Sequence, residues 1–261
     1  MEITELRPSL YMVRVEFGQL YLWRDGDAVT LVDTGVPGSA AAIAEALASL
    51  GLAPSAVERI VITHGHEDHA GAAEEVRSWH GAPVHVHEAD APFVTGETPR
   101  PEPVVTEFDA HLWEQISSLG LASTPPTTVD VLLHEGDELD FGGGARVLSI
   151  PGHTPGSVAV YLPEPRVLFT GDTIGTTPDG VVILGVFNQD EDQQLESFHR
   201  MAALDVETAC IGHGGPVVTG AAVDPGNIST ADRVVAILGV AVGVFSADQV
   251  VDETTNPLGP A

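Results

Sequence analysis

Hydrophobic positions along the chain follow two spacings, one typical of strands and one typical of helices. Short runs rich in β-branched and aromatic residues, bounded by glycine and turn residues, predict strands at 10–17, 19–23, 28–33, 57–63, 83–87, 129–133, 145–150, 157–162, 166–170 and 208–212. Apolar residues at helical spacing predict helices at 39–50, 68–80, 111–121 and 190–204. Strands and helices alternate in two similar halves, which indicates an α/β protein.

The stretch 92–128 differs in composition from the rest of the chain, because it is rich in proline. Prolines interrupt regular structure there at positions 92, 99, 101, 103, 125 and 126. We interpret it as an inserted cap over the functional site, with four candidate wall residues, Phe93, Phe108, Leu112 and Trp113. The alternative is a small helix that only packs on the sheet. The apolar segment 180–188 is a second candidate source of pocket residues.

The chain is strongly acidic. Its 261 residues carry 38 acidic and 10 basic side chains, a formal net charge of −28, and every base is an arginine. Such a surface repels nucleic acid backbones and polyphosphates, and the absence of lysine excludes lysine Schiff-base chemistry. We expect no nucleic acid partner and a neutral or largely apolar acyl substrate, although a local patch can oppose the global charge.

Cysteine usage and the N-terminal residues bear on the compartment. The single cysteine, Cys210, has no intramolecular partner, which fits a reducing environment. The first residues show no cationic segment followed by an apolar stretch, and no apolar run reaches the ~18 residues of a membrane span. We therefore expect a cytoplasmic protein that makes no membrane contact.

The densest cluster of chemically active side chains is THGHEDH at 63–69. Three imidazoles and a carboxylate within six residues suit zinc, iron and similar ions. The segment follows a predicted strand directly, and α/β proteins place ligand sites at strand ends. Because alternate residues of an extended chain point the same way, His64 and His66 can hold one ion while Asp68 and His69 reach a second.

Four further motifs follow predicted strands in the same way: VDTG at 32–35, PGHTPGS at 151–157, FTGD at 169–172 and IGHG at 211–214. In order and spacing, the five motifs resemble the metallo-β-lactamase superfamily, over residues from about 10 to about 220. The resemblance implies the fold of that family, an α/β four-layer αββα sandwich.

The resemblance also implies a role for each motif residue. The first of two divalent metal ions would be bound by three imidazoles, those of His64, His66 and His153. The second would be bound by Asp68, His69 and His213. Asp172 would bridge the ions, and Asp33 would support the site from behind the ligands. The ions, zinc with iron or manganese as alternatives, would share a hydroxide that attacks the substrate, and Asp68 would orient it.

Family membership does not fix the reaction, but departures from subgroup patterns narrow it. His69 and Asp172 occur together in glyoxalase II-like thioesterases and lactonases, whereas the classes of zinc β-lactamase lack one or both. Nucleases of the superfamily have basic surfaces or extra domains. The pattern therefore implies hydrolysis of a thioester or of a lactone or other ester. A glutathione thioester fits less well, because this chain has no lysine to help hold glutathione.

Three alternatives stay open. The first is a mono-iron oxygenase similar to persulfide dioxygenases, which share the H-x-H-x-D-H pattern; metal content would distinguish it. The second is a thioesterase or cyclase that acts on a carrier-bound acyl or polyketide chain. The third is a metal-stabilised binding module without activity.

The segment 224–261 is predicted to be a helical extension and tail beyond a catalytic domain at 1–223. Residues 234–245 are apolar on every face, which predicts burial on more than one side. We expect either packing on the same chain or a homodimer in which residues 229–245 form part of the interface.

Overall fold

The structure is a computed structural model that describes residues 2–107, 110–118, 122–176, 182–214 and 217–218. Phe108 and the predicted interface segment 229–245 therefore lie outside the described residues, as does the whole extension 224–261. No helix in the described ranges is long and apolar enough to cross a membrane.

The N-terminal half forms a seven-stranded sheet in which the strands follow one another in chain order. The strands are β1 (Glu2–Arg7), β2 (Leu10–Val15), β3 (Gly18–Asp25), β4 (Ala28–Val32), β5 (Val57–Val61), β6 (Val84–His87) and β7 (Val131–Leu133). Strands β1 to β4 pair antiparallel, and β4 to β7 pair parallel. The change of direction at β4 places the carboxyl ends of β4 and β5 at the same edge.

The C-terminal half forms a six-stranded sheet in the order β15-β14-β11-β10-β9-β8. Its strands are β8 (Glu138–Leu139), β9 (Ala145–Ser149), β10 (Val158–Leu162), β11 (Val167–Gly171), β14 (Thr208–Ile211) and β15 (Val217–Val218). Because β10 is antiparallel to both β9 and β11, and β14 is parallel to β11, the chain leaves β9, β11 and β14 at one edge. A separate hairpin, β12 (Ile174–Thr176) and β13 (Val182–Leu184), follows β11.

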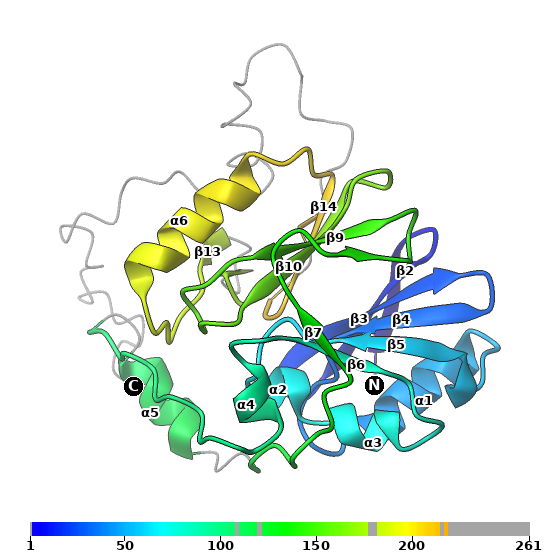
Figure 1. The fold of residues 1–261 in the computed structure, drawn as a ribbon, viewed down its shortest axis with the longest axis horizontal. Helices are drawn as coiled ribbons and strands as arrows, with labels where there is room; N and C mark the ends of the chain where they lie inside the picture. The colour runs from blue at the N-terminus through cyan, green and yellow to red at the C-terminus, as the bar shows by residue number, and fades with distance from the viewer. Residues whose placement is uncertain (1, 108–109, 119–121, 177–181, 215–216, 219–261) are drawn as a thin grey trace, which may run out of the picture.

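Helices cover the outer face of each sheet, so the molecule has four layers, αββα (Figure 1). The helices are α1 (Ala40–Ser49), α2 (Glu67–Ala70), α3 (Ala73–Arg77), α4 (Ala91–Val94), α5 (Ala110–Ser118) and α6 (Glu191–Ala202), with a 3₁₀ turn η1 (Pro54–Ala56). A buried cluster between the sheets joins side chains of both halves, including Tyr21 and Phe169, whose rings meet edge to face at 5.6 Å. The predicted αββα sandwich is confirmed.

One sequence prediction about helices needs correction. The helix predicted at 68–80 is two short helices, α2 and α3, with Gly71 and Ala72 between them. A Cβ at Gly71 would clash with Glu67 O and with the ring of Pro37, so this position between the two helices requires glycine. Ser39 occupies the N-cap position of α1, but its side chain makes no capping hydrogen bond.

The two sheets meet at the edge where the ligand motifs end. Val158 N, in the second sheet, donates a hydrogen bond to Thr63 O, just after β5, at 2.8 Å. Gln19 N donates to Gly212 O, just after β14, at 3.2 Å. These links hold the loops of both halves against each other, and the candidate site lies between them.

Candidate metal centre

Each predicted ligand follows the carboxyl end of a strand at the edge where the sheets meet. His64 and His66 lie in the loop after β5, and Asp68 and His69 lie in α2, which begins one residue later. The other three follow β9, β11 and β14, and are His153, Asp172 and His213. The topology therefore brings together side chains that lie almost 150 positions apart in the sequence (149 between His64 and His213).

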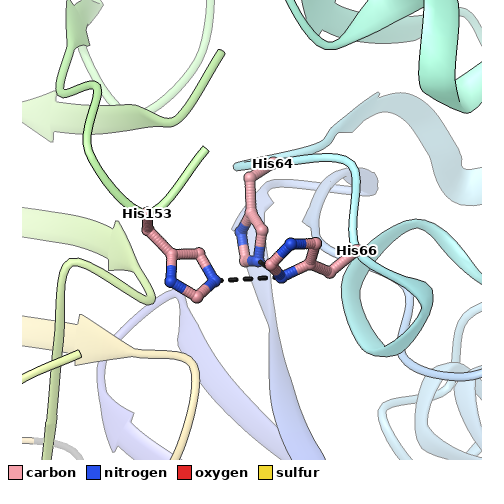
Figure 2. Close-up of side chains that lie close together, drawn as sticks. All are labelled: His64, His66 and His153. Carbon is pink, nitrogen blue, oxygen red and sulfur yellow. Dashed lines mark hydrogen bonds between the residues drawn. The ribbon is translucent and has the colours of Figure 1, made fainter. Parts of the chain in front are cut away.

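The first group is formed by the buried rings of His64, His66 and His153, which turn ring nitrogens toward one point (Figure 2). His66 Nδ1 lies 3.1 Å from His64 Nε2 and 2.9 Å from His153 Nε2. All three candidate ligand atoms lie within 4.8 Å of one another. This spacing is close to that of nitrogens around a single ion with metal–nitrogen bonds of about 2 Å.

The surroundings of the first group keep its rings neutral. Burial is the largest cause that lowers the pKa of His64, His66 and His153, and repulsion by the neighbouring imidazoles adds to it. A neutral imidazole is the form that binds a metal ion. The three rings are thus ready to bind a cation without first losing a proton.

The second group consists of Asp68, His69, Asp172 and His213, whose ligand atoms also lie within 4.8 Å of one another. His213 Nε2 lies 3.1 Å from Asp68 Oδ2 and 3.1 Å from Asp172 Oδ2. His69 Nε2 lies 3.2 Å from Asp172 Oδ1. Two carboxylates and two imidazoles form a mixed oxygen and nitrogen donor set that suits zinc, iron or manganese.

The carboxylates of the second group attract positive charge strongly. Burial opposes protonation of His213, but Asp172 and Asp68 outweigh it and raise the pKa of His213 to about 10. Burial likewise opposes protonation of His69, yet Asp172 and Asp33 raise its pKa well above the ordinary value. A divalent ion would replace these protons, because metal binding releases protons from its ligands.

Asp172 lies between the two groups. Its Oδ2 is 3.6 Å from His153 Nε2 and 3.9 Å from His64 Nε2, both in the first group, while its Oδ1 faces His69. Gly212 makes room for it, because a Cβ at position 212 would clash with Asp172 Oδ1. One carboxylate thus faces ligands of both groups, as a bridging ligand must.

Some of the donor atoms are placed to bind metal ions but not to form hydrogen bonds with one another. His69 Nε2 and Asp172 Oδ1 are buried and near each other, but without the geometry of a hydrogen bond, so each lacks a hydrogen-bond partner among the described residues. A buried polar atom without a partner is costly, and a cation would satisfy both. The residues present therefore fit divalent metal ions.

Asp33 supports the site from behind the ligands. Its Oδ2 lies 2.9 Å from His69 Nδ1 and accepts a hydrogen bond from Thr63 Oγ1 at 2.8 Å, while Oδ1 accepts one from Thr63 N at 2.8 Å. A carboxylate at Nδ1 fixes the ring so that Nε2 faces the metal position. The backbone of Asp33 is left-handed, with φ of 62°, which turns the chain out of β4 toward the site.

A cavity of about 520 Å³ opens onto both groups. Its floor contains Asp68, Asp172 and three of the histidines, and its walls are mostly apolar, from Phe17, Pro103, Leu112, Trp113, Ile116, Ile174, Leu184, Val186 and Phe187. Leu112 and Trp113 therefore line the cavity, as does part of the segment 180–188. Phe93, expected in the same wall, is not among the lining residues; it belongs to α4, which packs on the first sheet through Ala91 and Val94.

Comparison with known proteins places this geometry in a family. Residues 13–213 match the metallo-beta-lactamase superfamily. The chain belongs to this superfamily. It is 29% identical to the probable metallo-hydrolase YflN of Bacillus subtilis, over 82% of this chain and 86% of the relative. Among solved structures, the metallo-beta-lactamase family protein TTHA1429 of Thermus thermophilus matches with a TM-score of 0.61 and 30% identity, over 81% of this chain and 75% of that one.

The name of another relative states a specific reaction. A hydroxyacylglutathione hydrolase of Fuscovulum blasticum is 30% identical over 67% of this chain and 56% of its own length. Membership of the superfamily and the match to metallo-hydrolases, together with the His and Asp clusters, support a metal-dependent hydrolase.

Sequence reasoning missed three polar residues that bear on the site. Asp90 is buried and accepts hydrogen bonds from both ligand loops, Arg100 lines the cavity, and Asn188 Oδ1 lies 3.2 Å from His153 Nδ1. None of the three belongs to a motif. The signal for Asp90 was its position after a strand end, and Arg100 was the lone base of the proline-rich stretch.

Proposed function

We propose that this chain is a dinuclear-metal hydrolase that cleaves a thioester or a lactone or other ester. The observation that supports this most directly is the pair of donor groups that share Asp172. Two ions held by such a pair of groups would supply a Lewis acid for the carbonyl oxygen and water with a lowered pKa. The hydroxyacylglutathione hydrolase among the relatives supports an acyl substrate.

The chain's own residues would orient the reactants. Asp68 lines the cavity and its Oδ2 lies 3.1 Å from His213 Nε2, so it is placed to orient the attacking water and to take its proton. In the reaction, water gives its oxygen to the acyl carbon as the acyl–sulfur or acyl–oxygen bond breaks. The leaving sulfur or oxygen takes the proton. The products are a carboxylic acid and a thiol or alcohol.

Two donor groups favour this proposal over a mono-iron oxygenase. An oxygenase with one iron would hold it with two His and one Asp, and would leave the other donors without a role. In the group of Asp68, His69, Asp172 and His213, as in the first group, all candidate ligand atoms lie within 4.8 Å of one another. A carrier-bound acyl chain remains within the proposal, since only its acyl arm needs to enter the cavity.

The proposal is tested with a panel of neutral acyl thioesters, lactones and the β-lactam nitrocefin, on protein whose metal content has been quantified. We expect turnover of a thioester or lactone that depends on two equivalents of zinc, iron or manganese, and little turnover of nitrocefin. Failure of every thioester, ester and lactone at full metal content, or oxygen consumption with a persulfide on a one-iron protein, would contradict it.

A further inference from the structure

One arginine, Arg100, lines the mostly apolar walls of the cavity, together with the polar residues Glu67 and Ser117. Apart from histidines, Arg100 is the single basic side chain among the described residues that line it. The chain has only ten bases for 38 acids, so a base in the cavity is unusual on composition alone. The side chain of Arg100 lines the cavity and is 29% exposed, so it is not fully buried by its neighbours.

Arg100 is held beside the metal ligands by Glu67. Its Nη1 lies 3.0 Å from Glu67 Oε2, and Glu67 stands between His66 and Asp68 in the ligand motif. Arg100 and His66 line the same cavity. Pro99 and Pro101 flank Arg100 and restrict the backbone that presents it.

The pairing with Glu67 leaves donors unused. A guanidinium has five N–H donors in a planar fork, and among the described residues Glu67 is the one side chain that forms an ion pair with it. The fork fits a carboxylate by two parallel hydrogen bonds. A dianionic phosphate fits less well, because Glu67 and the acidic surface would repel its second charge.

We propose that Arg100 determines specificity by binding a carboxylate on the acyl part of the substrate, so that the preferred substrates are ω-carboxyacyl thioesters or esters. This rests on the proposed hydrolysis. The apolar walls would hold the methylene chain and the metal ligands the reacting carbonyl. Arg100 would hold the far carboxylate. The expectation of a neutral substrate from net charge is thereby refined, since one local cation opposes the global field.

The test compares two thioesters of N-acetylcysteamine that differ only at the acyl terminus, adipoyl and hexanoyl. The metal-loaded enzyme should show a higher kcat/KM for adipoyl by about tenfold or more, the scale of one hydrogen bond to a charged group. Arg100→Met should abolish that ratio and Arg100→Lys should retain part of it. Arg200→Met is the matched control, because Arg200 pairs with Glu135 at 2.7 Å and does not line the cavity.

The outcomes separate this inference from the proposed function. Equal turnover of both thioesters by the unaltered enzyme, or an unchanged ratio in Arg100→Met, overturns the role of Arg100 and leaves the hydrolase proposal intact. If neither thioester is turned over, calorimetric binding of adipate and hexanoate gives the same comparison without catalysis. Tighter binding of adipate that is lost in Arg100→Met supports the inference, and equal binding overturns it.

Discussion

Asp90 is a single residue that ties together the two loops of the first ligand group. Its carboxylate accepts hydrogen bonds from Gly65 N at 2.8 Å, from Gly156 N at 2.7 Å and from Thr154 Oγ1 at 2.7 Å. Gly65 lies between His64 and His66, and Thr154 follows His153. Burial raises the pKa of Asp90 and the hydrogen bonds to its oxygens oppose that rise. Asp90 therefore fixes how far apart the two loops lie.

Replacing Asp90 should destabilise the chain through the donors it leaves behind. Asp90→Ala strands two buried N–H groups, so we expect a loss of about 2–4 kcal/mol in the free energy of unfolding, measured with urea in the presence of a chelator. Asp130→Ala is the control. The Asp130 carboxylate is 30% exposed and also accepts a backbone N–H, from Val84, so water can replace it and the loss should be under about 1 kcal/mol. Equal losses in the two variants would contradict the role of Asp90.

At the residue scale, the sequence motifs predicted the side chains that the structure brings together, but not their supports. A ligand such as His153 is conspicuous because its residue type is rare and its motif follows a strand. Asp90 and Arg100 belong to common residue types, and their importance comes from contacts with residues distant in the sequence. Only the packing of α4 and of the cap segment reveals those contacts.

At the scale of elements, α5 and the segment before it contact the loop after β13. Val104 N donates to Asn188 O at 3.1 Å, and the rings of Trp113 in α5 and Phe187 meet edge to face at 5.1 Å. Since Trp113 lines the cavity, this junction forms one of its walls. The backbone at Phe187 is left-handed, with φ of 61°, which is costly for a bulky residue and fits a functional constraint.

Removing the Trp113 ring from this wall should change which acyl chain lengths the enzyme prefers. We expect Trp113→Ala to shift the ratio of kcat/KM for long over short acyl thioesters by about tenfold toward long chains, because the cavity gains room. Trp79→Ala is the control, since Trp79 packs on the helical layer and does not line the cavity. If both variants lose thermal stability and neither changes the ranking, α5 only packs on the fold.

The sequence predicted helices and strands correctly where the spacing of apolar residues matched the face that the fold buries. Most strands of the two sheets follow apolar runs, though β1 does not, and α6 follows helical spacing with Asp190 as its cap, which accepts from Gln193 N at 3.0 Å. The prediction of helices and strands failed where contacts between distant residues matter or where an element is too short to show a pattern. The close contact of Gly71, between α2 and α3, with Pro37 joins positions that are distant in the sequence, and the two-residue strand β8 is too short to have a periodicity.

At the scale of the whole molecule, we propose that the segment 229–245, which is apolar from 234 to 245, forms part of a homodimer interface; packing within its own chain is the alternative. The segment lies outside the described residues, so the expectation rests on its sequence, which is apolar on every helical face at 234–245. Light scattering should give twice the chain mass for the full chain at micromolar concentration and a single mass for a chain ending at Gly226. A monomeric full chain would show that the segment packs within its own chain.

The metal content per chain tests whether seven side chains hold two ions through a shared Asp172. Elemental analysis of the purified protein and of Asp172→Ala, after equilibration with a measured excess of zinc, gives the number of ions per chain. We expect two ions per chain in the unaltered protein. In Asp172→Ala we expect a joint loss of bound metal and hydrolysis, because one carboxylate faces both groups. One ion per unaltered chain, or two ions held by Asp172→Ala at undiminished affinity, would contradict this expectation.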